Sequence, residues 1–136
     1  MTPTDLARIH AAAFADTRGW SSNEFADLLT PPHTQIFSKT GGFAVTRTIA
    51  GETELLTLAV APDFQRRGIA KSLLSDWLSQ AARVADTAFL EVAADNLGAL
   101  ALYSQMSFLQ SGRRKSYYAR ANGEAIDAIL MTRALT

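Results

Sequence analysis

The sequence reads Gln65-Arg66-Arg67-Gly68-Ile69-Ala70 at the point where an apolar segment passes into an amphipathic one. The apolar segment, residues 54–60, has almost no polar face, which predicts a central strand buried on both sides. The amphipathic segment, residues 68–84, has one apolar stripe at helical spacing, formed by Ile69, Leu73, Leu74, Trp77, Leu78 and Ala81. The short stretch between them is therefore predicted to join a buried strand to the first turn of a helix.

Such a junction is suited to binding an anion. The first turn of a helix has unpaired backbone N–H groups, and the helix dipole is positive there. Gly68 and Ala70 are small enough to let a ligand approach the backbone, while Arg66, Arg67 and Lys71 add positive charge. We therefore predict a phosphate-binding loop. The alternative is a surface turn with solvated arginines, which short motifs of this kind also describe.

Helices are predicted before this junction and after it. The first covers 4–14 with Thr4 as its cap, and the second follows Trp20 with a capping box formed by Ser21 and Glu24. Pro31-Pro32 should end the second helix. A further helix should begin at Asn96 and end near Met106.

The remaining segments are predicted to be strands. They cover 34–39, 43–49 and 88–92, followed by a closing hairpin of 110–118 and 125–134 around Asn122-Gly123. Short turns join 34–39, 43–49 and 54–60, so these three strands should be antiparallel. A helical crossover precedes 88–92, which should therefore run parallel to 54–60. We expect one mixed α/β domain that spans residues 1–136.

Composition excludes several classes of protein. The chain has 136 residues, of which 48% are hydrophobic, and its 13 basic and 13 acidic residues give no net charge. A general basic field is therefore absent, and we expect no direct nucleic-acid binding. With no cysteine and two distant histidines, we expect no metal site and no thiolate catalysis. No signal peptide or membrane segment is evident, so we expect a cytoplasmic protein.

At this point the chain resembles a known family. The run from Ala61 to Leu74 resembles the acetyl-CoA-binding motif of the GNAT superfamily, which is Gln or Arg, two residues, Gly, one residue, then Gly or Ala. The block from Phe89 to Asn96, continued to Tyr103, is similar to the RimI branch, as are Ser107-Phe108 and residues 113–118. Members of that branch acetylate the N-terminal alanine of a ribosomal protein. The resemblance covers about residue 20 to the end.

The resemblance implies a fold, a co-substrate and a set of site residues. The fold is a mixed, mostly antiparallel sheet of six or seven strands with about four helices and a splayed parallel strand pair at the cofactor cleft. Family members usually begin with a strand before the first helix. No such strand is evident here, so the sheet could have six strands instead of seven. Acetyl-CoA would be bound by Leu58, Ala59, Val60, Arg66, Arg67, Gly68, Ile69, Ala70, Lys71 and Asn96. Glu91 matches the family's proton acceptor, and Tyr103 matches its proton donor.

The residues themselves support Glu91 as a base. It is the only charged residue in 88–92, and a carboxylate inside a buried strand is costly without a partner or a function. At the end of a parallel strand it could accept a proton from an ammonium, and an α-amine has a pKa of only about 7.7–8.0. The alternative is a carboxylate at the rim of the cleft, paired with an arginine.

Tyr103 could supply a proton to the same cleft. It lies seven residues after Asn96, so both side chains should share one face of a helix. A phenol with a pKa of about 10 can protonate a leaving thiolate, although a core tyrosine is an equally ordinary outcome. Backbone N–H groups near Ala59 or Val60 could stabilise the oxyanion of the reaction.

Other conspicuous residues are given structural roles. Trp20, Phe25 and Trp77 should pack in the core, and His10 should be structural or exposed. Residues 113–115 read as a solvated charge run, next to two tyrosines, 117 and 118, that could line a peptide slot. The function expected is acetylation of a protein N-terminus. Acetylation of a small amine or a lysine, and a non-catalytic acyl-CoA-binding module, are the alternatives.

Overall fold

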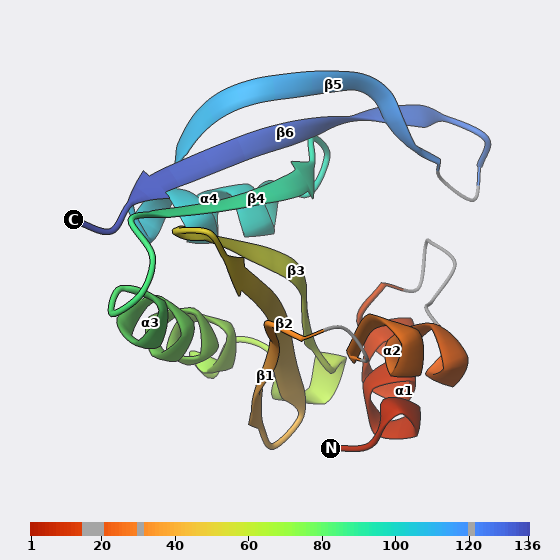
Figure 1. Cartoon of the computed structure of the whole chain (residues 1–136). Helices are drawn as coiled ribbons and strands as arrows, with labels where there is room; N and C mark the ends of the chain where they lie inside the picture. Colours follow the sequence, from red (N-terminus) through yellow and green to blue (C-terminus); the bar gives the residue numbers. More distant parts are fainter. Residues whose placement is uncertain (15–20, 30–31, 120–121) are drawn as a thin grey trace.

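The computed structural model describes residues 1–14, 21–29, 32–119 and 122–136. Within these residues one sheet of six strands runs in the order β1-β2-β3-β4-β6-β5 (Figure 1). The strands are β1 (Thr34–Lys39), β2 (Gly42–Ile49), β3 (Glu52–Val60), β4 (Thr87–Ala93), β5 (Leu109–Ala119) and β6 (Ala125–Ala134). Among the described strands, only β3 and β4 pair in parallel. The predicted mixed, mostly antiparallel sheet is therefore confirmed.

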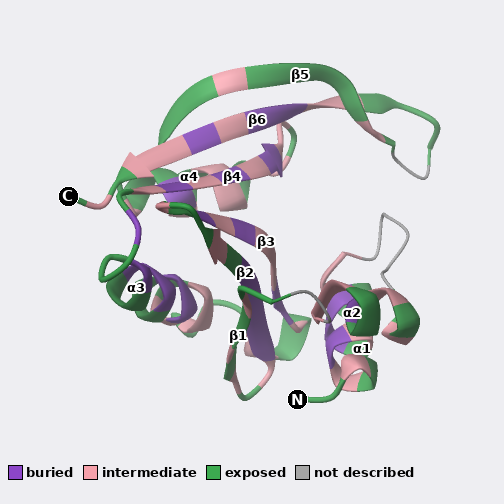
Figure 2. Cartoon of the chain, in the orientation of Figure 1, coloured by how far each residue is buried: buried purple, intermediate pink, exposed green. Residues whose placement is uncertain are grey.

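Four α-helices cover the two faces of the sheet in the described residues. They are α1 (Pro3–Ala13), α2 (Ser22–Leu29), α3 (Ile69–Ala81) and α4 (Leu97–Gln105), and a short 3-10 turn, η1 (Pro62–Phe64), precedes α3. Phe43 and Val45 of β2 face a core with α1 and α2, whereas Ala44 faces a core with α3 and α4. The alternation of side chains along a strand thus divides the buried residues into two layers (Figure 2).

Helix ends follow local capping rules, with one correction. The predicted cap at Thr4 is wrong. α1 begins at Pro3, and Thr2 caps it by accepting a hydrogen bond from the Asp5 amide at 3.2 Å. Pro at the first helical position favours this earlier start. The capping box of α2 is confirmed, since the Ser21 Oγ accepts from the Glu24 amide at 3.1 Å. Trp20 and the first proline of Pro31-Pro32 lie outside the described residues.

Trp77 fixes α3 against the sheet. Its side chain is fully buried and stacks on Phe108 with 6.1 Å between the ring centroids, as the prediction of a packing role requires. Its indole Nε1 donates to the Thr53 Oγ1 of β3 at 2.8 Å. Thr53 in turn shares a hydrogen bond with the Thr48 Oγ1 of β2 at 2.8 Å. This chain of contacts sets the position of α3 relative to β3.

The pairing of β3 changes halfway along the strand. Leu56 is left without a partner because Leu55 pairs with Thr46 while Thr57 pairs with Val45. The parallel pairing with β4 ends at Leu55 and Leu90, at the same level. A bulge increases local twist and bends a strand, which is how β3 separates from β4. The predicted complete burial of β3 is consequently wrong for 56–58, which are half-buried beside the resulting opening.

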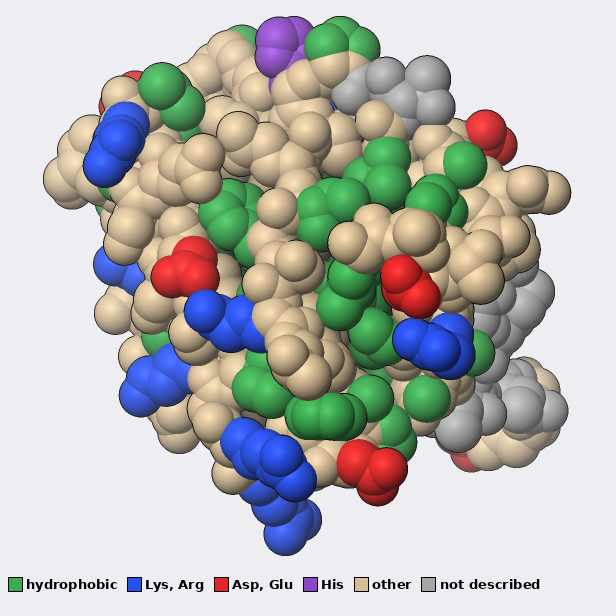
Figure 3. Space-filling model, turned by 90° about the horizontal axis from the view of Figure 1, so that it is seen from below, with side chains coloured by type: hydrophobic (Ala, Val, Ile, Leu, Met, Phe, Trp, Pro, Cys, Tyr) green, Lys and Arg blue, Asp and Glu red, His purple; other side chains and the backbone are tan. Residues whose placement is uncertain are grey.

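The surface carries both signs of charge. On the face shown in Figure 3, Lys and Arg side chains are interspersed with Asp and Glu. This arrangement matches the balance of 13 basic and 13 acidic residues in the sequence. Among the described helices, none combines the length and the apolar character that a membrane span requires.

Candidate active site

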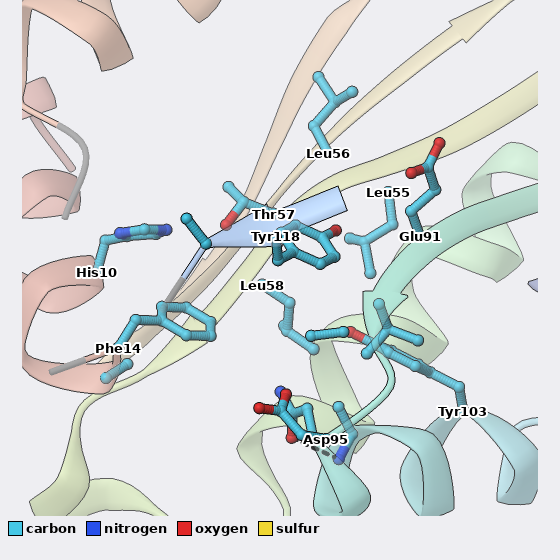
Figure 4. A pocket seen from close by; sticks show the side chains of 16 residues that line it. His10, Phe14, Leu55, Leu56, Thr57, Leu58, Glu91, Asp95, Tyr103 and Tyr118 are labelled. Carbon is cyan, nitrogen blue, oxygen red and sulfur yellow. Dashed lines mark hydrogen bonds between the residues drawn. The ribbon is translucent and has the colours of Figure 1, made fainter. Parts of the chain in front are cut away.

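A cleft of about 630 Å³ opens where β3 and β4 part (Figure 4). β3 contributes one wall, the end of β4 and the start of α4 contribute another, and α1 and β5 close the sides. The residues that line it are His10, Ala13, Phe14, Leu55, Leu56, Thr57, Leu58, Glu91, Val92, Ala93, Asp95, Asn96, Ala99, Tyr103, Tyr118 and Ala119. The structure therefore brings four of the predicted site residues to one cavity: Leu58, Glu91, Asn96 and Tyr103.

The free edge of β3 presents backbone groups to this cleft. The Ala61 amide donates to the Gly41 carbonyl at 2.8 Å, so the backbone of Ala61 faces β2. Because backbone groups alternate sides along a strand, Ala59 also faces β2, while Leu58 and Val60 face the space that β4 has left. The Val60 carbonyl accepts a hydrogen bond from the Gln65 Nε2 at 3.0 Å. Leu58 and the Val60 amide are thus the groups best placed to bind a ligand that lies along this edge.

The predicted phosphate loop lies at the start of α3. Gly68 is the N-cap and has a φ of 75°, and Arg66 has a φ of 63°. Two residues of the loop therefore adopt the left-handed backbone conformation. No side chain caps this helix, which leaves the N–H groups of its first turn available. A Cβ placed on Gly68 would meet nothing within 4 Å, so the space above it is open. These features fit the binding of a pyrophosphate.

Contacts to η1 hold the loop in place. The Arg67 guanidinium lies over the Phe64 ring, 5.2 Å from its centroid. Phe64 itself packs against the β1–β2 turn, where a Cβ on Gly41 would come within 2.3 Å of the Phe64 Cγ. Glycine at 41 is therefore required by this close approach and by its own φ of 81°. The exposed loop is thus anchored through the contact of its Arg67 side chain with Phe64.

Glu91 enters the cleft from β4 with its side chain 21% exposed. Its Oε1 lies 3.2 Å from the Nη2 of Arg114 on β5. Glu91 was interpreted either as a base in the cleft or as a rim carboxylate paired with an arginine. The structure has features of both, because Glu91 lines the cleft and also pairs with Arg114. A carboxylate in this position can accept a proton from a cationic substrate that approaches along the cleft.

Tyr103 reaches into the same cleft from α4 (Figure 4). Its ring packs edge-on against Phe108. Its side chain is buried, with 7% of the residue exposed. Burial raises the pKa of the Tyr103 hydroxyl above its ordinary value, and the neighbouring Tyr118 adds to the shift. The hydroxyl is therefore protonated at neutral pH and can act as a hydrogen-bond or proton donor.

The raised pKa of Tyr103 predicts how stability changes at alkaline pH. Below about pH 10 the phenol is protonated in the folded and unfolded chain alike, so it contributes no pH dependence. Above that value only the unfolded chain loses the proton, and the free energy of unfolding falls by up to about 1.4 kcal/mol per pH unit. We expect a shallower fall for Tyr103→Phe in urea titrations between about pH 10 and 12. Equal slopes for the two proteins would contradict the shift.

Asn96 serves as the cap of α4 as well as lining the cleft. Its Oδ1 accepts from the Ala99 amide at 3.1 Å, which confirms the predicted helix start. This bond stabilises the first turn of α4, the helix that carries Tyr103. The same hydrogen bond also fixes the orientation of the NH₂ group of the Asn96 side chain.

Several cleft residues had no clear signal in the sequence. His10 is buried, with its ring 4.7 Å from that of Phe14, and both line the cleft. The expectation of a structural His10 is confirmed, but its position beside the cleft depends on how α1 packs on the sheet. The charge run expected at 113–115 is exposed, as predicted, and its first two residues also form ion pairs. Arg113 pairs with Asp127 at 2.6 Å, and Arg114 pairs with Glu91.

A loop suited to a pyrophosphate, leading to a cleft with a carboxylate and a protonated phenol, suits acyl transfer from a coenzyme A thioester to an amine. Comparison with known proteins agrees with this class. The chain belongs to the acetyltransferase (GNAT) family, whose model matches residues 9–108. It is thus an acetyl-CoA-dependent N-acetyltransferase, and the fold expected from the motif is confirmed.

Named relatives share much of the chain. A [ribosomal protein bS18]-alanine N-acetyltransferase of Escherichia coli K12 is 36% identical over 94% of this chain and 90% of its own length. One from Salmonella typhimurium is 41% identical over 65% of this chain, and that match spans 60% of the relative's length. The crystal structure of the ribosomal-protein-S18-alanine N-acetyltransferase from Escherichia coli superposes with a TM-score of 0.88 at 32% identity, covering 100% of this chain and 91% of that one.

Proposed function

We propose that this enzyme acetylates the N-terminal α-amine of a protein, and that its acceptor is a ribosomal protein beginning with alanine. The observation that carries the proposal is the meeting of Glu91 and Tyr103 at one cleft beside the open edge of β3. Relatives that match most of the chain are named for this acceptor, which supports the choice. The reaction would take place in the cytoplasm, where ribosomal proteins and acetyl-CoA are both available.

The acetyl-CoA side of the site is assigned to β3 and the start of α3. The pyrophosphate would be held by Arg66, Arg67, Gly68, Ile69, Ala70 and Lys71, and the pantetheine arm would run along Leu58, Ala59 and Val60, with Asn96 as a further contact. The uncapped first turn of α3 supplies N–H donors, and the outward-facing backbone of Leu58 and Val60 supplies both donors and an acceptor.

The chemistry is a direct transfer. Glu91 accepts one proton from the acceptor ammonium and releases it to solvent, which leaves a neutral amine. The amine nitrogen bonds to the thioester carbonyl carbon, and the N–H of Val60, which faces the cleft at the end of β3, stabilises the oxyanion. Collapse breaks the carbon–sulfur bond, and Tyr103 donates its proton to the departing thiolate. The second proton lost by nitrogen restores the Tyr103 hydroxyl.

The acceptor side is assigned to the opposite wall of the cleft. Tyr118 lines that wall, and Tyr117, which is 54% exposed, lies beside it on β5. A peptide can approach along these residues and pair its backbone with the parted strand ends. Small first residues are favoured, because the amine must reach the thioester between Leu58 and Tyr103.

Peptides test this assignment of the acceptor. We expect peptides that start with alanine or serine to be acetylated at least about 10-fold better, in kcat/KM, than the same peptides with a blocked N-terminus and an internal lysine. The α-amine is partly neutral at pH 7, whereas a lysine with a pKa near 10.4 is not. Mass spectrometry locates the acetyl group. Acetylation mainly on lysine, or on free small amines while peptides stay unmodified, would replace this acceptor and leave the family assignment intact.

A further inference from the structure

β5 contains an irregularity beside the cleft. Arg114 pairs with Ala128 of β6, and the next pair is Tyr118 with Ile126, so residues 115–117 of β5 lie opposite Asp127 alone. Ser116, in the middle of this bulge, has a φ of 53°. A non-glycine residue in the left-handed region is strained unless its surroundings hold it there.

Asp127 makes two side-chain hydrogen bonds to the bulged part of β5 and one backbone hydrogen bond to the chain after β4. Its Oδ1 accepts from the Ser116 amide at 2.8 Å, and its Oδ2 accepts from the Arg113 Nε at 2.6 Å. Its backbone carbonyl accepts from the Ala94 amide, just after β4, at 2.8 Å. The Ser116 amide, and then the Arg113 guanidinium, lower the pKa of the Asp127 carboxyl. The ionised carboxylate thus ties the middle of the bulge to Arg113 just before it, while the backbone of the same residue is bonded to the chain just after β4.

The bulge determines which β5 side chains reach the cleft. Arg114, just before it, pairs with Glu91, and Tyr118, just after it, lines the cavity. In a regular strand these two residues would be about 14 Å apart along the axis, at about 3.4 Å per residue. Their partners Ala128 and Ile126 are only two residues apart, so the bulge shortens this separation to about 7 Å. Tyr118 can therefore line the cleft while Arg114 reaches Glu91 in the same cleft.

We propose that Asp127 is a positioning residue for the acceptor wall of the cleft. Its hydrogen bonds maintain the bulged conformation of β5. In this conformation Arg114 and Tyr118 together form the surface against which the acceptor lies. In the described part of the chain, the hydrogen bonds of Asp127 given above go to β5 and to the residue after β4, whereas the acetyl-CoA side is assigned to 58–60 of β3 and the start of α3. This role rests on the proposed function, because it assumes that the acceptor occupies the β5 side of the cleft.

Steady-state kinetics separate this role from a general effect on folding. Asp127→Ala should raise KM for an alanine-starting peptide by about 10-fold, the effect of losing a charge-assisted hydrogen bond, with KM for acetyl-CoA unchanged. Asp127→Asn keeps an oxygen for the Ser116 amide, and should therefore restore a large part of the acceptor affinity. It also serves as the test variant if Asp127→Ala does not fold.

Glu54→Ala is the matched control. Glu54 forms a cross-strand ion pair with Arg47 at 3.1 Å, and its side chain is 24% exposed compared with 23% for Asp127. This control should leave both KM values unchanged. The proposal is overturned if Asp127→Ala leaves the acceptor KM unchanged, or if it raises both KM values together. Failure of the proposed function is detected separately, because the wild-type enzyme would then acetylate another amine. In that case the KM values of the variants are compared with that amine as the acceptor.

Discussion

Glu91→Gln is expected to lower kcat by about 10²–10⁴, the usual contribution of a general base, while the affinity for acetyl-CoA changes little. The amide has nearly the size of the carboxylate and still accepts a hydrogen bond from Arg114, but it cannot accept a proton from the ammonium. Rates at saturating peptide and acetyl-CoA, together with calorimetry of acetyl-CoA binding, give both quantities.

Arg114→Gln provides the control for the ion pair. If Glu91 served only as a rim carboxylate paired with Arg114, removing either partner would have the same consequence for kcat. If Glu91 is the base, the arginine variant should retain far more of kcat than Glu91→Gln, whatever happens to its KM for the acceptor. Equal values of kcat in the two variants would assign Glu91 to structure instead of catalysis.

Tyr103→Phe belongs to the same prediction and should also lower kcat by about 10²–10⁴. The phenyl ring keeps the packing against Phe108, so the loss is confined to the hydroxyl. An acetyl donor with a more acidic leaving thiol needs less help from an acid, and the deficit of the variant should shrink with such a donor. Wild-type turnover by both the Glu91 and Tyr103 variants would remove the catalytic roles proposed for them.

The fold could be predicted because its signals are local. The apolar stripe of α3, the capping box at Ser21 and the cap at Asn96 each depend on residues a few positions apart, and all three are present in the structure. The burial of β3 was overestimated because hydropathy alone cannot show that β4 will part from it. That separation depends on a bulge at Leu56, which arises from the register between two strands.

The site could be predicted only where family resemblance or spacing connected the residues. Asn96 and Tyr103 share one helix, so their common direction follows from helical geometry. The pairing of Glu91 with Arg114 depends instead on the order β4-β6-β5, in which β6 lies between the two partners. Likewise, Asp127 meets Ser116 only because β5 bulges. Contacts of this kind come from tertiary register, which no local pattern contains.

Gly68→Glu is expected to weaken acetyl-CoA binding by at least about 30-fold, or about 2 kcal/mol, because a carboxylate then lies at the N–H groups intended for phosphate. The site is open at this point, because an added Cβ has no described atom within 4 Å. Isothermal titration calorimetry measures the change directly. A folded variant with undiminished affinity would remove the phosphate-loop assignment.

Gly123→Glu is the control that separates charge in the loop from strain in the backbone. Gly123 has a φ of 86°, compared with 75° for Gly68, and it also has nothing within 4 Å of an added Cβ. The two variants therefore introduce the same side chain, with similar backbone strain, at two open positions. Gly123 lies in the β5–β6 connection, far along the chain from the start of α3.

Thermal unfolding should show similar destabilisation in both proteins, because the left-handed conformation disfavours any side chain in each. Only Gly68→Glu should lose acetyl-CoA affinity, and an equal loss in both would trace the effect to stability instead of to the anion site.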